Sequence, residues 1–61
     1  MRVKWKKFER YTSSNQFSEQ AGAGTLINFV YIGSDVVGVV NHGAKFVQVP
    51  IVYLETDGKD A

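Results

Sequence analysis

Apolar and polar positions along residues 25–55 fall into three short runs separated by turn residues. The runs are rich in Val, Ile, Phe and Tyr, which suit a pleated and buried surface. Between them stand Gly33-Ser34-Asp35 and Asn41-His42-Gly43-Ala44, whose residue types favour tight turns. The pattern predicts an antiparallel meander with strands over residues 25–32, 36–40 and 45–49.

The first of these strands is apolar on both faces. Ile27, Phe29 and Tyr31 point one way, and Leu26, Val30 and Ile32 point the other, with Asn28 among them. An antiparallel strand with one solvated face usually alternates apolar and polar residues. We therefore expect the outer face of residues 25–40 to be covered by the N-terminal strand, the loop after it or another subunit. The pattern leaves open which face is inside.

Single glycine and proline residues mark bends in this region. Gly38 interrupts the valines of residues 36–40, which predicts a bulge or sharp bend. Pro50 cannot donate to a ladder, so we expect the third strand to end there. A 3₁₀ turn near residues 50–53 and a short last strand follow. Residues 1–55 then form one domain, and residues 56–61 form a polar, acidic tail.

The N-terminal half is less regular. Residues 2–11 read as one strand with Val3, Trp5 and Tyr11 on one face, or as a helix in which Trp5, Phe8 and Tyr11 align. The strand is favoured because a helix this short has no N-cap and is marginal alone. Residues 12–24 are small and polar, which predicts a long loop anchored by Phe17, or one helical turn starting near Thr12.

These elements together resemble the SH3-like small β-barrels. The resemblance rests on Gly24-Thr25-Leu26-Ile27, on Val36-Val37-Gly38-Val39-Val40 and on the closing segment Val49-Pro50-Ile51-Val52-Tyr53-Leu54-Glu55. It implies an all-β fold: a single antiparallel barrel of roughly five short strands with a long loop after the first. The closing segment is also similar to that of the plasmid-borne trimethoprim-resistant dihydrofolate reductases. That likeness would imply a tetramer in which Gln48 faces a central pore.

Length and composition restrict the function. A chain of 61 residues without Cys has neither disulfides nor thiolate metal sites. Small domains often gain stability by oligomerisation, so we expect a homo-oligomer. No signal peptide or membrane span is indicated, which favours a cytoplasmic protein without a membrane partner. No cofactor, small-molecule substrate or catalytic residue is expected, and we predict that the chain is not an enzyme.

Charge is distributed unevenly along the chain. The overall charge is +1, but residues 1–10 carry +4 and the remainder carries −3. The basic segment also contains aromatic residues, and cations attract phosphates while aromatic rings stack on bases. The predicted nucleic-acid-binding residues are Arg2, Lys4, Trp5, Lys6, Lys7, Phe8 and Arg10. The competing interpretation is that the aromatic residues belong to the core and the lysines protect an edge strand.

Other polar residues suggest little chemistry. His42, the only histidine, lacks an acidic neighbour and is expected in a turn. Asp35 is expected to hold its own turn, and the acidic residues 55–60 to be solvated. Residues 21–24 lead into a strand, unlike a phosphate-binding loop, so we interpret them as a linker.

The sequence therefore predicts a non-enzymatic binding module, a small accessory or regulatory protein that contacts nucleic acid through its basic and aromatic N-terminal strand. The alternative is a protein-interaction or inhibitor module that uses the apolar outer face of residues 25–40. By analogy, such small chains are typical of phage or mobile-element accessory proteins.

Overall fold

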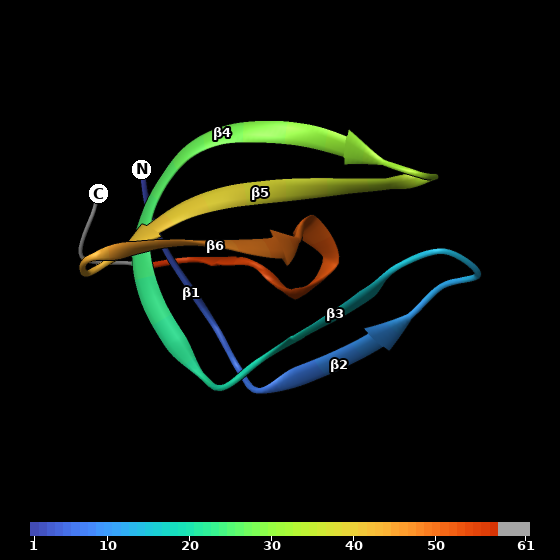
Figure 1. Ribbon diagram of the computed structural model, residues 1–61. Helices are drawn as coiled ribbons and strands as arrows, with labels where there is room; N and C mark the ends of the chain where they lie inside the picture. The colour runs from blue at the N-terminus through green and yellow to red at the C-terminus, as the bar shows by residue number, and fades with distance from the viewer. Residues whose placement is uncertain (58–61) are drawn as a thin grey trace.

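The computed structural model describes residues 1–57, and these residues form an antiparallel all-β fold (Figure 1). This confirms the predicted all-β class. The strands and the one short 3₁₀ helix are β1 (Arg2–Trp5), β2 (Phe8–Tyr11), β3 (Gln16–Glu19), β4 (Gly22–Ile32), β5 (Asp35–His42), β6 (Lys45–Pro50), η1 (Ile51–Tyr53) and β7 (Glu55–Thr56).

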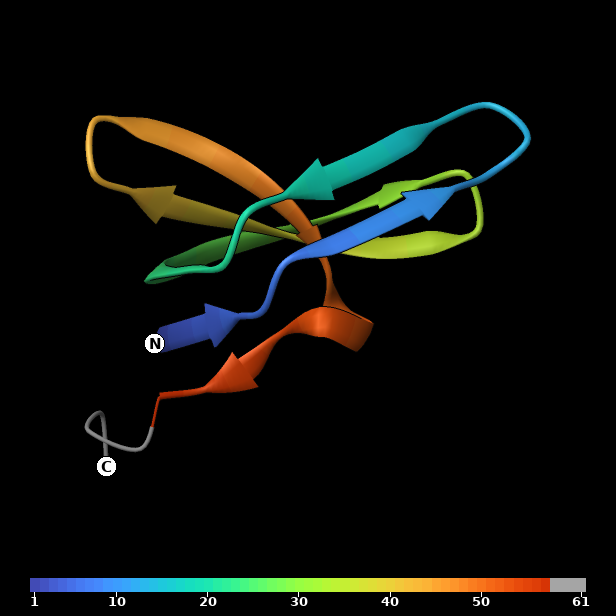
Figure 2. The ribbon, with the colours of Figure 1, turned by 90° about the horizontal axis from the view of Figure 1, so that it is seen from below.

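The strands form two sheets. One has five strands in the order β6-β5-β4-β1-β7, and the other is the β2-β3 hairpin. The hairpin extends away from the end of β1, while β4, β5 and β6 run back and forth beside one another (Figures 1 and 2). β6 and β7 are the edges of the large sheet, and within residues 1–57 no strand pairing closes it into a barrel.

The predicted meander is confirmed. β4, β5 and β6 pair antiparallel in sequence order, and the two connecting turns contain glycines in the left-handed region, Gly33 at φ 62° and Gly43 at φ 67°. β6 ends at Pro50, and η1 follows as predicted, with the Leu54 N–H donating to the Ile51 carbonyl at 3.1 Å.

The bend in the meander lies elsewhere than predicted. The register shifts between Leu26 and Asn28 in β4, whereas β5 pairs continuously through Gly38. Gly38 is instead a site of close packing. A Cβ at this position would lie 2.7 Å from Leu54 Cδ1 and 2.9 Å from Leu26 Cδ1. The glycine therefore makes room for two leucines of the core.

The N-terminal predictions need correction. Residues 2–11 form two strands in different sheets, because the chain changes direction at Lys6 and Lys7. Residues 12–24 do not form a long loop or a helical turn: they contain β3 and the start of β4. The hairpin turn is held by Thr12, whose N–H donates to the Asn15 carbonyl at 2.8 Å. Phe17 is buried, as predicted for the anchor of this segment.

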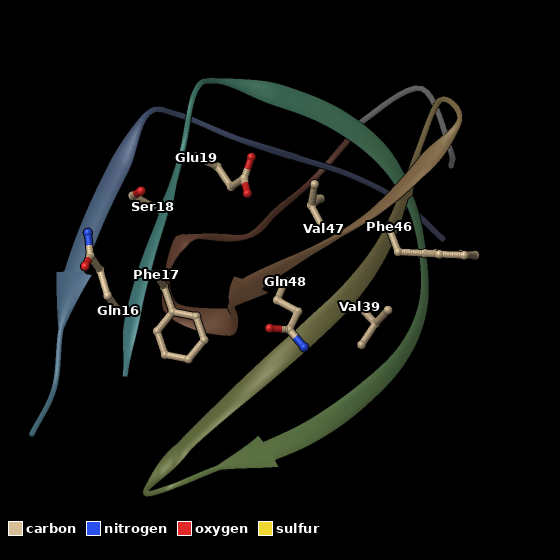
Figure 3. A pocket seen from close by; sticks show the side chains of 8 residues that line it. All are labelled: Gln16, Phe17, Ser18, Glu19, Val39, Phe46, Val47 and Gln48. Atoms are coloured by element: carbon tan, nitrogen blue, oxygen red, sulfur yellow. The ribbon is translucent and has the colours of Figure 1, made fainter. Parts of the chain in front are cut away.

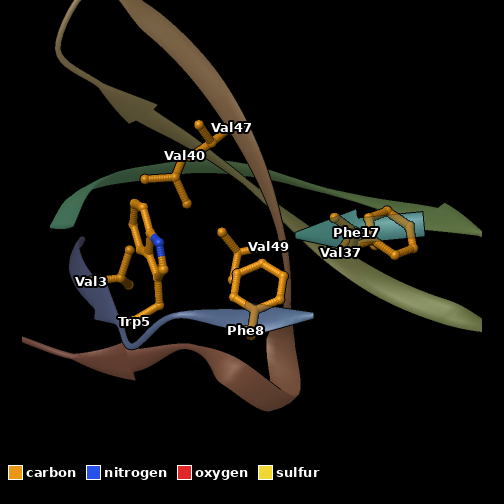
Figure 4. Packing of buried hydrophobic residues seen from close by; sticks show 8 residues of the cluster. All are labelled: Val3, Trp5, Phe8, Phe17, Val37, Val40, Val47 and Val49. Atoms are coloured by element: carbon orange, nitrogen blue, oxygen red, sulfur yellow. The ribbon is translucent and has the colours of Figure 1, made fainter. Parts of the chain in front are cut away.

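The core lies between the large sheet and the hairpin. Figure 4 shows side chains from β1, β2, β3, β5 and β6 converging: Val3, Trp5, Phe8, Phe17, Val37, Val40, Val47 and Val49. Leu26, Val30 and Ile32 pack against this cluster, whereas Ile27, Phe29 and Tyr31 are exposed. The predicted division is therefore confirmed for the apolar residues, whereas Asn28, predicted on the face of Leu26, is exposed after the register shift. The expected cover over the face of Ile27, Phe29 and Tyr31 is not supplied by the described chain.

The C-terminal segment joins the sheet at β1. Thr56 pairs with Val3 in β7, and the Asp57 N–H donates to the Arg2 carbonyl at 3.0 Å. The rest of the predicted tail, residues 58–61, lies outside the described residues. Within residues 1–57, no helix has the length and apolar character needed to cross a bilayer.

Candidate nucleic-acid interface

The cations of β1 lie on the outer face of the large sheet. Arg2 and Lys4 are exposed and alternate with the buried Val3 and Trp5, as the two-residue period of a strand requires. Lys4 pairs with Ala23 of β4 on one side and with Glu55 of β7 on the other. β1 therefore presents cations to solvent beside two acidic residues of the C-terminal segment: Glu55, which pairs with Lys4, and Asp57, whose N–H donates to the Arg2 carbonyl.

Lys6 and Lys7 occupy the connection between β1 and β2. Both are exposed, and they line a shallow hollow of about 180 Å³ together with Val52, Tyr53 and Glu55. The hollow combines the two ammonium groups with the ring of Tyr53 in η1 and the carboxylate of Glu55. These lysines continue the exposed cations of β1 into the connection that leads to β2.

Trp5 belongs to the core. It is 3% exposed, its indole Nε1 donates to the Gln20 carbonyl at 2.8 Å, and its ring meets the edge of His42 at 5.5 Å between centroids. Gly22, its cross-strand partner, leaves the space that the indole fills, since a Cβ there would lie 2.8 Å from Trp5 Cζ2. The indole has no free face for a base, which corrects its predicted stacking role.

Phe8 is also a core residue. It is 6% exposed and stacks on Tyr53 with 4.7 Å between ring centroids and 13° between planes. The stack joins β2 to η1, so it fixes the hairpin against the C-terminal segment. The predicted base-stacking role of Phe8 is corrected in the same way, because its ring already has an aromatic partner.

Arg10 forms an ion pair with Asp35. Its Nη2 lies 2.7 Å from Asp35 Oδ1, and its Nε donates to Asp35 Oδ2 at 3.2 Å. This two-point geometry gives strong, oriented pairing. The hydrogen bond from Arg10 holds the pKa of Asp35 below its usual value, and the same bond raises the pKa of Arg10. Asp35 therefore ties β5 to β2, a role beyond the turn predicted for it.

The other polar residues considered as candidates make contacts within the fold. His42 Nδ1 lies 2.7 Å from the Ala23 carbonyl, which links β5 to β4 at the end of the strand. Residues 22–24 belong to β4, so the glycines serve strand packing. Within residues 1–57, no group of three or more His, Cys, Asp and Glu side chains is placed to hold a metal ion.

The structure keeps part of the predicted site together. Arg2, Lys4, Lys6 and Lys7 remain exposed on neighbouring elements, whereas Trp5 and Phe8 are buried in the core and Arg10 is held in its ion pair with Asp35. Sequence reasoning missed Phe46, which is 66% exposed on β6. The signal was the alternation in Phe46-Val47-Gln48-Val49, which places Phe46 on the face opposite the buried valines. Comparison with protein families, curated proteins and solved structures gives no match.

Proposed function

We propose that this chain binds nucleic acid through Arg2, Lys4, Lys6 and Lys7. The observation that carries the proposal is that these four cations, spaced over six residues, are all exposed. Clustered cations gain affinity for a phosphate backbone by releasing its condensed counterions. The carboxylates near these four cations are those of Glu55, Asp57 and Glu9, so positive charge exceeds negative charge by one here.

The test is fluorescence anisotropy with labelled oligonucleotides of mixed sequence, single- and double-stranded, over a range of salt concentrations. Replacing both Lys4 and Lys6 by Gln should weaken binding and reduce the slope of log K against log salt by close to two. Replacing Ser13 and Ser14, both exposed at the hairpin turn, by Glu gives a control with the same net charge. The control should bind more tightly than the lysine variant.

Comparing the two variants distinguishes a binding site at the lysines from an effect of net charge alone. Equal weakening by both variants would mean that only net charge matters, which contradicts a site at these lysines. Absence of binding by the unaltered chain at low salt would overturn the proposal.

A protein-interaction surface is the second candidate, and the exposure of β4 favours it. Ile27, Phe29 and Tyr31 project from one strand, and Tyr31 is 81% exposed. Contiguous exposed apolar side chains mark interaction sites in soluble proteins. The partner in this proposal includes a second copy of the chain, in keeping with the predicted homo-oligomer. Val37 is buried and Val30 packs on the core, so Phe29→Ser with Tyr31→Ser is the suitable test variant.

Sedimentation velocity distinguishes the two candidates. Association through these apolar residues should persist at high salt and fail in the double serine variant, whereas nucleic-acid binding should weaken with salt. If the chain remains monomeric at high concentration, self-association through these residues is excluded.

We also propose that the architecture is an SH3-like barrel. The order of elements supports it: a first strand, a hairpin, a three-stranded meander, a 3₁₀ turn and a last strand paired with the first.

A further inference from the structure

Strand register places four residues, three exposed and one half-buried, in one row across the large sheet. Arg2 of β1 pairs with Thr25 of β4, Thr25 pairs with Asn41 of β5, and Asn41 pairs with Phe46 of β6. Directly paired residues project on the same side of a sheet. A cation, a hydroxyl, an amide and an aromatic ring therefore follow one another over four adjacent strands. We call this set the outer row.

The burial pattern shows that the outer row faces solvent. The neighbours in sequence that project on the opposite side, Val3, Gly24, Val40 and Val47, are all buried, whereas none of the outer row is. A second row lies beside it, in which Asn28, Val39 and Gln48 are cross-strand partners. This end of the sheet thus has one apolar face in the core and one face of mixed polar and apolar residues that reaches solvent.

The chemistry of the two rows suits a nucleic acid. Their side chains offer amide and hydroxyl groups for base edges and sugars and a broad aromatic ring. The rows themselves contain no carboxylate, and Asp57 lies beside Arg2 at the β7 edge. Lys4 projects on the same side of β1 as Arg2 and adds a second cation near this surface. An aromatic ring with cations on one surface is the combination that binds unpaired bases and their phosphates.

Phe46 also borders a groove with a carboxylate on its far side. The groove of about 360 Å³ lies between β3 and the β5-β6 pair, and Figure 3 shows Phe46, Val39 and Gln48 on one side and Phe17 and Glu19 on the other. Glu19 repels phosphate from that end, whereas the cations lie toward β1. Three inter-strand steps of about 4.8 Å separate β6 from β1, roughly 14 Å or a few nucleotides.

We propose that the outer row binds single-stranded nucleic acid, with Phe46 stacking on a base and the phosphates directed toward β1. The inference rests on the proposed function and adds the aromatic contact that Trp5 and Phe8 cannot supply. A single strand is specified because a base in a duplex has both faces covered by its neighbours, whereas an unpaired base can stack on a side chain.

The experiment measures affinity for a labelled single strand and for the corresponding duplex in four proteins: unaltered, Phe46→Ala, Phe46→Tyr and Tyr11→Ala. Phe46→Ala should weaken single-strand binding by about tenfold, the scale of losing one base stack, with little effect on the duplex. Phe46→Tyr should restore binding because the ring is kept. Tyr11→Ala removes an exposed aromatic ring of β2, in the other sheet, and should bind like the unaltered chain.

The outcomes distinguish this inference from the proposed function. If Lys4→Gln with Lys6→Gln weakens binding but Phe46→Ala does not, the cations bind phosphate and the outer-row inference is overturned. If the unaltered chain binds no nucleic acid, both fail. If Phe46→Ala instead abolishes self-association and leaves nucleic-acid affinity unchanged, Phe46 is a protein contact and the inference is overturned. Thermal unfolding of each variant confirms that the proteins compared are folded.

Discussion

Replacing Trp5 by Phe tests whether the indole supports the fold or contacts a ligand. In the structure the ring is buried against Gly22, its Nε1 donates to the Gln20 carbonyl, and its edge contacts His42. The smaller ring removes the hydrogen bond and leaves part of this space empty. Because none of these partners is a ligand, the substitution should lower stability and leave affinity of the folded protein unchanged.

The size of the effect follows from the interactions that a phenyl ring cannot make. The Nε1 hydrogen bond contributes about 1 kcal/mol, and the apolar surface no longer filled contributes about 1 kcal/mol more. The expected loss is therefore about 2 kcal/mol, against a total stability of roughly 3–9 kcal/mol for a domain of this length. The melting temperature should fall by about 8–16 °C. Trp5→Ala should lower the free energy of unfolding by about 3–5 kcal/mol, which approaches the total stability of the domain.

Circular dichroism is the suitable readout, because Trp5 is the only tryptophan and the variant loses its fluorescence. Urea unfolding of the variant is compared with that of Tyr31→Ala, an exposed position where the expected change is within about 0.5 kcal/mol. An unchanged unfolding midpoint in Trp5→Phe, together with weaker nucleic-acid binding, would refute the assignment of the indole to the core.

Two further predictions concern the ion pair and the glycines. Since the Arg10 guanidinium holds the pKa of Asp35 below its unfolded value of about 3.9, the pair stabilises the fold above about pH 4, and this contribution disappears as pH falls through the folded pKa. Asp35→Asn should therefore lower the melting temperature at pH 7 and reduce the dependence of the melting temperature on pH below 4. Equal slopes of melting temperature against pH in the variant and the unaltered chain would contradict this prediction. Gly24→Ala should destabilise by about 3 kcal/mol or more, because its Cβ would meet the rigid Asn41 carbonyl, whereas Gly38→Ala should cost about 1 kcal/mol, because it meets flexible leucine ends. Urea unfolding checks both glycine variants, and the reverse order of stability would contradict the packing argument.

The meander was predictable because its signals are local. Strands rich in β-branched residues, turns with Gly33 and Gly43, and a strand end at Pro50 each depend on a few neighbouring residues. The two-residue period also separates the apolar residues of 26–32 into their two faces, but it does not predict that Asn28 is exposed.

The N-terminal half was harder to predict because long-range contacts decide it. One continuous alternation through residues 2–11 hides the change of direction at Lys6, after which Phe8 rather than Lys7 is buried. The β3 strand has only one large apolar residue, Phe17, and is stabilised by pairing with β2. The bulge after Leu26 likewise arises from the register of β4 with β5 and not from a glycine.

The candidate site was predictable for cations but not for aromatic residues. Exposure of Lys4, Lys6 and Lys7 follows from the cost of burying charge. Whether an aromatic ring is core or surface depends on its partners: Tyr53 covers Phe8, whereas nothing in the described chain buries Phe46. The outer row depends on the register of four strands, which no local pattern specifies.

The most direct test of the account is a ¹H–¹⁵N NMR titration of the chain with a single-stranded oligonucleotide at low and moderate salt. The account predicts shifts at Lys4, Thr25, Asn41 and Phe46 that diminish as salt rises, with the Trp5 indole signal unchanged. An unperturbed spectrum at low salt, or shifts confined to Phe29 and Tyr31, would contradict a nucleic-acid surface on the outer face of the sheet.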